Sequence, residues 1–372
     1  AQAVHPGYGF LSENASFAKM LEDHKLTFIG PKYTHIEAMG DKIQAKKIMK
    51  EFGVPTVPGS DQAIEGEKDA LIISNEIGFP VLIKASAGGG GRGMKVVHNE
   101  KELSEALPII KQEALSFFGN DAVYIEKFID SPRHIEVQVI CDKYGNFLHL
   151  HERDCSVQRR NQKVIEEALA PGINEEEKNK LFSICIKAMQ KMGYLGLGTL
   201  EFLYEKGEFY FMEMNTRLQV EHPITEMLTR IDLVREQICV AAGEKIFTTQ
   251  DNIKPLGHSI ECRINAENSE TFKPSTGTIG LFHPPAGNGI RLDTFIYSGY
   301  KVPHYYDNLL AKLISTGRTR NHAIKRALRS LNEIVIDGID TNIELHKKIL
   351  SSTDFKNGSV SINWLENNIS SL

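Results

Sequence analysis

The length, composition and charge of the chain already exclude several classes of protein. Its 372 residues suffice for two or three domains, and with 41% hydrophobic and 24% charged residues it can bury a large core. The formal net charge of −5 gives no general attraction for nucleic acid, and no apolar run approaches the roughly 20 residues of a membrane span. We therefore expect a globular protein that binds neither nucleic acid nor membranes.

The first part of the chain is predicted to alternate helices and strands, which favours α/β or α+β packing. Asp41 is a candidate N-cap for a helix that Gly53 and Pro55 end. The apolar run at residues 80–85 predicts a strand, and residues 94–97 predict its partner after a glycine stretch. This region therefore predicts a helix followed by a strand–loop–strand unit.

The second part of the chain is predicted to contain two β-hairpins separated by a helix. Alternating apolar residues at 135–141 and the turn-rich stretch 143–146 predict the first hairpin, and the residues flanking a turn at 205–208 predict the second. Between them, Asn174 as N-cap and Glu177 three residues later form a capping box. The three helices predicted here run from Asn174 to Gly193, from Asp232 to Gly243 and from Asn321 to Leu331.

The spacing of cysteine and histidine argues against a disulfide framework and a structural zinc site. The five cysteines are far apart and none lies in a C-x-x-C pair, which favours a reducing compartment such as the cytoplasm. They are Cys141, Cys155, Cys185, Cys239 and Cys262. His149 and His151 are two apart on a predicted strand, but no carboxylate or cysteine completes a zinc set, so we interpret them as structural.

A glycine-rich loop follows the first of these strands. Residues 88–93 match G-x-G-x-x-G, but a strand rather than a helix follows, which excludes the dinucleotide fingerprint. Glycine amides can close over phosphates from above, and a flexible surface turn is the alternative. Lys84, at the end of the apolar strand, favours phosphate binding, because an ammonium there needs an anion or a carboxylate.

The second hairpin carries several carboxylates. If its turn is centred on Gly207, Glu201 faces Glu213 and Thr199 faces Asn215. Like charges directly opposite on a sheet are destabilising unless a cation lies between them. Carboxylate and amide oxygens are ligands that Mg²⁺ or Mn²⁺ accepts, so the hairpin predicts a metal site, with a solvated polar face as the alternative.

Charged residues directly after this hairpin predict a site for a small oxyanion. Arg217, Gln219 and Glu221 are spaced by two, so an extended segment would point all three side chains the same way. A guanidinium beside a carboxylate suits an oxyanion that must be held and deprotonated.

Two other sets of charged residues have ordinary alternatives. Residues 159–163 include three basic side chains and could form a basic surface turn. Arg263 could be an ordinary strand arginine paired with Glu261 or Glu267. The residues alone leave both alternatives open.

Six motifs, in this order, resemble the biotin carboxylase family, the ATP-grasp subunit of biotin-dependent carboxylases: HPGYGFLSEN, GDK, KASAGGGGRGMKVV, ERDCSVQRRNQK, EMNTRLQVEHPITE and ECRINAE. The similarity covers essentially the whole chain, and the motifs are specific as a set. The resemblance implies an α/β and α+β multidomain protein with an ATP-grasp fold. Its expected parts are a remnant of an N-terminal Rossmann-like domain with a linker at 1–56, a lid domain with the glycine loop at 57–130, and the catalytic and C-terminal domain at 131–372.

The resemblance also implies a reaction, its cofactors and its partners. The reaction is MgATP-dependent carboxylation of biotin by bicarbonate through carboxyphosphate, the first half-reaction of acetyl-CoA carboxylase in fatty acid synthesis. ATP and two Mg²⁺ or Mn²⁺ ions are the expected cofactors, and biotin is the substrate, borne by a biotin carboxyl carrier protein. A carboxyltransferase component and a second copy of the chain, in a homodimer, are the other expected partners.

The same resemblance assigns roles to individual residues. The implied ATP-binding residues are Lys42, Lys84, Gly88, Gly89, Gly90, Gly91, Glu126, Lys127, Phe128, Ile129 and His134, of which residues 126–129 hold adenine and His134 the ribose. The implied metal ligands are Glu201, Glu213 and Asn215, in agreement with the hairpin argument. The implied bicarbonate and biotin residues are Lys163, Arg217, Gln219, Val220 and Arg263. Glu221 matches the base that deprotonates bicarbonate, Arg263 matches the residue that stabilises the biotin enolate, and Lys163 and Arg217 complete the catalytic set.

The chain departs from the family pattern at two positions and in where it begins. Asn161 stands where some members have histidine, so no role of that histidine is carried over, and Leu169 replaces a common proline. The family pattern extends upstream of the first residue, so we expect the opening βα units, and any targeting segment for an organelle, to lie outside this chain.

Two other functions compete with the one that the resemblance implies. One is a different ATP-grasp ligase, in which a carboxylate or an amine replaces biotin. The other is a non-catalytic nucleotide-binding protein, which would be expected to have lost metal ligands, and all three implied metal ligands are present in the sequence.

Overall fold

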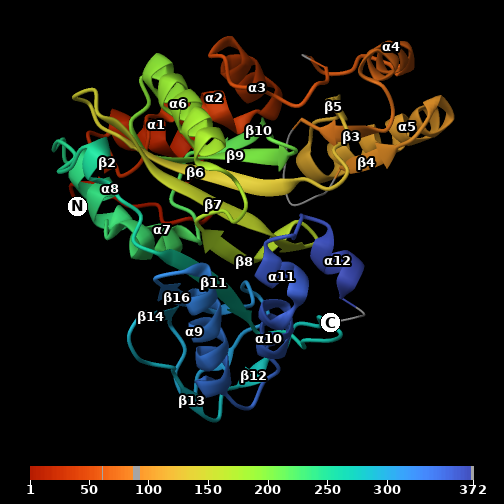
Figure 1. The fold of residues 1–372 in the computed structure, drawn as a ribbon. Coiled ribbons are helices and arrows are strands. Elements are labelled where there is room, and N and C mark those ends of the chain that lie inside the picture. The colour runs from red at the N-terminus through yellow and green to blue at the C-terminus, as the bar shows by residue number, and fades with distance from the viewer. Residues whose placement is uncertain (61, 87–92, 370–372) are drawn as a thin grey trace. The chain divides into compact units, whose positions relative to one another are not determined.

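The computed structural model describes residues 1–60, 62–86 and 93–369, which form two compact units. The first unit comprises Ala1–His149, Asn174–Gln219 and Val234–Gln250, and the second comprises Leu150–Ile173, Val220–Leu233 and Asp251–Leu372. Both units contain helices and strands (Figure 1), as the predicted α/β and α+β class requires. The predicted domain boundaries after residues 56 and 130 are not tested by this division and stay predictions.

The first unit contains strands of three separate groups, whose orders are β1-β2, β4-β3-β5 and β10-β9-β6. Its strands are β1 (Ala3–Val4), β2 (Thr27–Phe28), β3 (Val81–Ala85), β4 (Met94–Val97), β5 (Val123–Lys127), β6 (Arg133–Cys141), β9 (Gly196–Glu205) and β10 (Glu208–Asn215). Its helices are α1 (Ala15–Asp23), α2 (Tyr33–Gly40), α3 (Lys42–Glu51), α4 (Glu67–Ile77), α5 (Glu100–Phe118), α6 (Glu175–Met192) and α8 (Leu233–Ala241).

Two predicted helices of the first unit begin at the expected caps. The Asp41 side chain accepts a hydrogen bond from the Gln44 N–H at 2.8 Å, so α3 begins where the sequence predicts. At α6, the Asn174 side chain accepts from the Glu177 N–H and the Glu177 side chain accepts from the Asn174 N–H, which completes the capping box. Gly193 ends the helix in the left-handed conformation. Local side-chain chemistry therefore determines where these helices begin.

The sheet β4-β3-β5 shows how strand alternation places a lysine. Strands β3 and β4 pair antiparallel, which confirms the predicted pairing, and the predicted phosphate loop Gly88–Gly91 lies outside the described residues. Val81, Ile83 and Ala85 point into a core with α4 and α5, which flank the sheet in Figure 1. Lys84 is consequently on the opposite face of this sheet.

The second unit contains a sheet with the strand order β7-β8-β11-β16-β14 and two short strand pairs, β12-β15 and β13-β17. Its strands are β7 (Phe147–Arg159, of which most belongs to this unit), β8 (Gln162–Ala168), β11 (His258–Asn265), β12 (Gly277–Thr278), β13 (Phe282–His283), β14 (Ile290–Thr294), β15 (Lys301–Val302), β16 (Leu309–Gly317) and β17 (Val335–Ile336). Its helices are α7 (His222–Thr229), η1 (Gln250–Asn252), α9 (Arg320–Glu333), α10 (Ile343–Ser351), α11 (Thr353–Asn357) and α12 (Trp364–Asn368).

The two faces of the sheet in the second unit differ in chemistry. On one face, α9 and α10 pack against β11 and β16 over a core that includes Ile260, Cys262 and Ile264 (Figure 1). Glu261 and Arg263 alternate with these residues and therefore lie on the other face, against which α7 packs. The second unit thus has an apolar face and a charged face on the same strands.

Several smaller predictions can be compared with the structure. The helix predicted from Asn321 begins slightly earlier, because the Thr319 hydroxyl accepts the His322 N–H at 3.3 Å and serves as N-cap. His149 stacks on Phe182 with ring centroids 4.0 Å apart, as a structural histidine would. No disulfide joins cysteines in the described residues, and no helix among them is long and apolar enough to cross a membrane.

Candidate functional site

The carboxylate hairpin has the predicted register at the candidate metal ligands. Near the turn, Glu205 pairs with Glu208, one residue away from a hairpin centred on Gly207. A β-bulge between Phe211 and Glu213 then shifts the register by one residue. The pairs beyond the bulge are Glu201–Glu213 and Thr199–Asn215, which confirms the predicted pairing.

A third carboxylate extends this arrangement into a row across β6, β9 and β10. Glu136 lies directly opposite Glu201, which lies directly opposite Glu213, and we call these residues the carboxylate row. Glu136 is 0% exposed, and His134 Nε2 lies 3.1 Å from Glu201 Oε2. Three buried or half-buried carboxylates in line need compensating cations. Glu136 was not predicted as a site residue, although its alternation with apolar residues places it on the same face of β6 as His134.

Neutral and cationic donors already surround the middle of the carboxylate row. Asn215 Nδ2 and Gln219 Nε2 donate to Glu201 Oε1 at 2.9 and 2.7 Å. Arg217 donates from Nη2 to Asn215 Oδ1 at 2.9 Å and from Nε to Glu13 Oε2 at 2.8 Å. The ligand atoms that Glu201, Glu213 and Asn215 offer are hard oxygens, which fit Mg²⁺ or Mn²⁺. Glu13 was not predicted as a site residue, although it lies within the first family motif, HPGYGFLSEN.

Three lysines, which we call the lysine cluster, share two carboxylates in the first unit. Lys42 Nζ lies 2.9 Å from Glu213 Oε2, Lys84 Nζ donates to Glu126 Oε2 at 3.0 Å, and Lys46 also pairs with Glu126. Burial, with the nearby charge of Lys42, lowers the pKa of Lys84 to about 8. An added anion would therefore be stabilised here. Lys46 was missed in the sequence, although it follows Lys42 by four residues and so lies on the same helix face.

In the segment predicted to hold adenine, residues 126–129, two backbone N–H groups already donate hydrogen bonds within the protein. The Lys127 N–H donates to the Pro58 carbonyl at 2.7 Å, and the Phe128 N–H donates to the Pro80 carbonyl at 3.2 Å. Recognition of adenine by residues 126–129 would therefore use other backbone groups, such as those of Ile129.

The prediction that residues 217–221 form an extended segment is wrong. The chain leaves β10 at Asn215, bends at Arg217 and turns at Val220. Glu221 has φ −82° and ψ 7° and is the residue before α7. Pro223 explains the difference, because proline favours the first turn of a helix and so ends the extended path early.

In the second unit, the predicted base Glu221 is buried between two cations. Lys163 Nζ donates to its Oε1 at 2.5 Å and Arg263 Nη2 donates to its Oε2 at 2.9 Å, while only 2% of Glu221 is exposed. Burial alone would raise the pKa of Glu221, but the charges of Lys163 and Arg263 outweigh it and hold that pKa well below its usual value. We call Lys163, Glu221, Arg263 and Glu166, a further partner of Arg263, the base cluster. Glu221 is therefore ionised at neutral pH.

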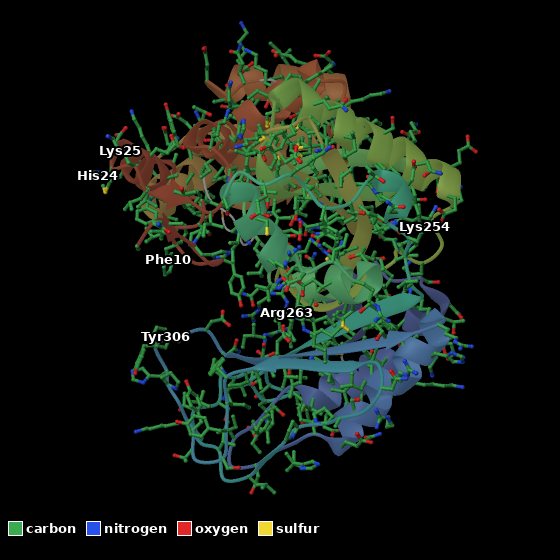
Figure 2. The ribbon with its side chains drawn as sticks, turned by 90° about the vertical axis from the view of Figure 1, so that its left-hand side faces the viewer. Phe10, His24, Lys25, Lys254, Arg263 and Tyr306 are labelled. Atoms are coloured by element: carbon green, nitrogen blue, oxygen red, sulfur yellow. The ribbon has the colours of Figure 1, made fainter. Side chains whose placement is uncertain are left out.

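The alternatives that the sequence left open for these cations can now be compared with the contacts. Arg263, labelled in Figure 2, pairs with Glu221 and Glu166. The alternative partners, Glu261 and Glu267, are not its ion-pair partners in the described residues. Glu267 instead lies 3.4 Å from Arg159 Nη2. Lys163 has a buried carboxylate partner, so it is not part of a solvated surface turn.

Asn161, where some family members have histidine, has a structural reason to be present. Arg160 and Asn161 join β7 to β8, and their φ angles are 50° and 59°. Two successive residues with positive φ are typical of a type I′ hairpin turn, and asparagine tolerates this conformation better than most residues.

The Val220 carbonyl accepts from Lys312 Nζ at 2.9 Å, which fixes the turn before Glu221.

Comparisons with known proteins agree with this arrangement of the chain. Family models match three consecutive segments: the biotin carboxylase N-terminal domain at residues 1–36, the carbamoyl-phosphate synthase L chain ATP-binding domain at 41–249, and the biotin carboxylase C-terminal domain at 261–367. The chain is 53% identical over 367 residues to a biotin carboxylase of Pseudomonas aeruginosa, covering 98% of this chain and 82% of that one. It is also 53% identical over 359 residues to the chloroplastic biotin carboxylase of Arabidopsis thaliana, covering 96% of this chain and 67% of the relative.

Solved structures are similar over the same length. The complex of biotin carboxylase with beta-gamma-ATP from Campylobacter jejuni has a TM-score of 0.96 and 48% sequence identity, covering 99% of this chain and 82% of that one. The biotin carboxylase domain dimer of Hydrogenobacter thermophilus 2-oxoglutarate carboxylase, in complex with MgADP, ADP and bicarbonate, has a TM-score of 0.96 and 47% identity over the same shares.

The fold and the matched ATP-binding domain define an ATP-dependent ligase of the ATP-grasp class. Within that class, the matches at both ends of the chain and the identity to curated relatives decide the assignment. The chain belongs to the biotin carboxylase family.

Proposed function

We propose that this chain catalyses the MgATP-dependent carboxylation of biotin by bicarbonate through carboxyphosphate. The observation that carries the proposal is the buried, ionised carboxylate of Glu221 between Lys163 and Arg263. A base held in this way is available to remove a proton from a bound oxyanion, which is the step that makes bicarbonate a nucleophile. The family assignment and the related structures bound to nucleotide and bicarbonate support the same reaction.

The first unit supplies the ATP-binding groups in this proposal. Lys42 and Lys84 contact the ATP phosphates, because the lysine cluster has more positive charge than its two carboxylates balance. The family resemblance also implies that residues 126–129 hold adenine and that His134 contacts the ribose; it assigns phosphate binding to Gly88–Gly91, which lie outside the described residues. Lys46 adds a further cation to the same cluster.

The metal ions have ligands in the same unit. Glu201, Glu213 and Asn215 would hold two Mg²⁺ or Mn²⁺ ions, and Lys42 would exchange its contact with Glu213 for ATP phosphate. When bound, the ions neutralise negative charge on the β and γ phosphates as the γ-phosphoryl group transfers.

In the second unit, substrate binding itself strengthens the base. Bicarbonate is an anion, so it competes with Glu221 for Lys163 and Arg263. Withdrawing these cations from Glu221 raises its pKa toward the usual value, so the carboxylate becomes more basic when the substrate is present. The bicarbonate O–H proton then goes to Glu221, and the freed oxygen attacks the γ-phosphorus of ATP as the bond to ADP breaks. The family resemblance also implies Arg217, Gln219 and Val220 as bicarbonate-binding residues.

Transfer to biotin needs a cation rather than a base. The N1′ nitrogen of biotin is a poor nucleophile until negative charge develops on the ureido oxygen. The Arg263 guanidinium, with 18% of its side chain exposed, stabilises that charge in our proposal. As the C–O bond of carboxyphosphate breaks, phosphate leaves and takes the N1′–H proton, and the carboxyl carbon forms a bond to N1′.

Partners and location are also proposed on the basis of the relatives. Biotin is expected on a biotin carboxyl carrier protein, with a carboxyltransferase component for the second half-reaction in fatty acid synthesis. A homodimer is proposed because the biotin carboxylase domain of the Hydrogenobacter relative is a dimer. A cytoplasmic location is proposed, with an organelle as the alternative because one relative is chloroplastic.

The test is ADP release by the purified chain with MgATP, when bicarbonate and free biotin are omitted in turn. We expect the rate to need bicarbonate and to rise with biotin. A rate that biotin does not raise, but that small amines or other carboxylates do, would support a different ATP-grasp ligase.

A further inference from the structure

Arg263 has a second carboxylate partner whose role the proposed reaction leaves open. Glu166 Oε1 accepts from Arg263 Nε at 2.5 Å, while Nη2 of the same guanidinium donates to Glu221 at 2.9 Å. Glu166 is 0% exposed. The guanidinium is therefore held at two different atoms, by Glu221 at Nη2 and by Glu166 at Nε.

Strand geometry places this second carboxylate. In the antiparallel pair β8–β11, Glu166 lies directly opposite Glu261, and Arg263 follows two residues along on the same face. Arg263 therefore reaches Glu166 diagonally across the two strands. Both residues belong to regular strands, and so their relative position is fixed by the sheet ladder.

The backbone of Arg263 is fixed as well. Its carbonyl oxygen accepts hydrogen bonds from Asn342 Nδ2 at 3.0 Å and from His346 Nε2 at 2.7 Å. Asn342 Oδ1 also accepts from the Asn265 N–H at 2.8 Å. The only freedom left to Arg263 is consequently in its side chain, where Glu166 acts.

We propose that Glu166 is a positioning residue for Arg263, which holds the guanidinium by Nε while Nη2 leaves Glu221 for the ureido oxygen of biotin. This inference rests on the proposed function. Without such an anchor, the pair of Arg263 with Glu221 would keep the base and the enolate-stabilising cation bound to each other. With Glu166 as anchor, the Nε end of Arg263 stays fixed while Nη2 moves, so Glu221 is free to accept a proton.

The charge on Glu166 makes the proposal pH-dependent. Burial, aided by the charge of Glu221 and opposed by that of Arg263, raises the pKa of Glu166 to about 7. The charged groups that face it come from every neighbouring element: Lys163 on β8, Glu261 and Arg263 on β11, Glu221 before α7, and Lys312 on β16 beside Glu261.

Glu261 does not neutralise Arg263 in place of Glu166. Burial, with the charge of Glu166, raises the pKa of Glu261 well above its usual value, and in the described part of the chain neither oxygen of Glu261 has a hydrogen-bond partner. Burial and the charge of Glu166 therefore favour the uncharged form of Glu261. As the pH falls through about 7, Glu166 also gains a proton and its hold on Arg263 weakens.

The test compares Glu166→Gln with Glu167→Gln, its neighbour on β8. Glu167 is also buried and also pairs with an arginine, Arg320, but on the opposite face. We expect Glu166→Gln to lower kcat/KM for biotin by at least about tenfold, a modest loss for a misplaced catalytic group, and to leave KM for ATP within about twofold. We expect Glu167→Gln to lower the unfolding temperature without changing kcat/KM for biotin.

The pH profile separates positioning from folding. The rate of biotin-dependent ADP release by the wild-type chain should decrease as pH falls through about 7, and we call this decrease the acid limb of the profile. The biotin-independent, bicarbonate-dependent rate should not show this limb. Glu166→Gln should lack the limb, and Glu166→Asp, which keeps the charge on a shorter side chain, should retain it with a raised KM for biotin.

Equal effects of Glu166→Gln and Glu167→Gln on kcat/KM for biotin would overturn the inference. So would a limb near pH 7 that persists in Glu166→Gln. If Glu166→Gln does not fold, the wild-type profile and Glu166→Asp decide: no limb in the wild type overturns the inference. A wild-type chain without biotin-dependent ADP release contradicts the proposed function instead, which separates the two failures.

Discussion

The lysine cluster of the first unit and the base cluster of the second handle buried charge in opposite ways. In the lysine cluster, three ammonium groups share Glu126 and Glu213, so positive charge is in excess. Burial, with the charges of the neighbouring lysines, lowers the pKa values of Lys46 and Lys84. In the base cluster, each cation has a carboxylate within 3 Å and Glu221 is held ionised. A site with excess positive charge is stabilised by an anionic ligand, whereas a site with balanced charge keeps its reactive carboxylate ionised.

This difference predicts which changes affect chemistry and which affect binding. Removing a member of the base cluster should act on the reaction steps and leave ATP affinity intact. Removing a member of the lysine cluster should act on ATP binding first. The predictions below test that separation, from the largest effect to the smallest.

Glu221→Gln should cause the largest loss. Without the carboxylate, the proton of bicarbonate has no acceptor, so we expect bicarbonate-dependent ADP release to fall about a hundredfold to a thousandfold, or at least ~3 kcal/mol. KM for ATP serves as the internal control and should stay within about twofold. Near-normal release by this variant would exclude Glu221 as the base.

Protonation of His346 should make the second unit sensitive to acid. Burial lowers the pKa of His346 to about 4, below the 6.5 of an exposed histidine. The unfolded chain therefore binds this proton first, and the stabilisation, fully present above pH 6.5, is lost as pH falls toward 4, by up to about 3 kcal/mol. Denaturant unfolding at several pH values measures it.

The matched variants for this prediction are His346→Gln and His24→Gln. Glutamine can still donate to the Arg263 carbonyl but cannot gain a proton, so His346→Gln should flatten the fall in stability between pH 6.5 and 4. His24, which Figure 2 labels, is exposed, and its replacement should leave the fall unchanged. An unchanged slope in His346→Gln would show that another group causes the acid sensitivity.

Arg263→Ala should depress transfer to biotin while sparing ATP binding. We expect biotin-dependent ADP release to fall about a hundredfold, because the charge that develops on the ureido oxygen loses its partner. The KM for ATP, measured in the same assay, should not follow. An equal loss of ATP affinity would mean that Arg263 is structural.

Lys84→Ala should have the smallest effect of the four and act on the other region. We expect KM for ATP to rise about tenfold, the scale of one charge-assisted contact to phosphate, with little change in KM for biotin. Lys95→Ala is the control, because Lys95 is an exposed lysine on the neighbouring strand β4. If both variants behaved alike, Lys84 would not contact the phosphates.

Local patterns predicted the elements better than their partners. Helix caps such as Asp41 and the pairing of Glu201 with Glu213 depend on residues close in sequence, and both predictions are confirmed. The bulge that produces this register is not visible in the alternation, because one extra residue leaves no mark on it. The right pair was therefore predicted with the wrong hairpin centre.

Contacts between distant elements could not be predicted from the sequence. Glu136, Lys46 and Glu166 join their clusters through strand neighbours or a facing helix, and no periodicity relates them to Glu201, Glu126 or Arg263. The extended path predicted for residues 217–221 failed for the related reason that a helix start competes with strand alternation at Pro223.

The central claim, that Glu221 activates bicarbonate for transfer to biotin, is tested most directly by labelled bicarbonate. The purified chain and Glu221→Gln are each incubated with saturating MgATP, biotin and ¹⁴C-bicarbonate, and acid-labile label on biotin is counted. The account predicts that the wild-type chain labels biotin and that Glu221→Gln labels it at least about a hundredfold more slowly. Labelling of biotin by Glu221→Gln at the wild-type rate would contradict it.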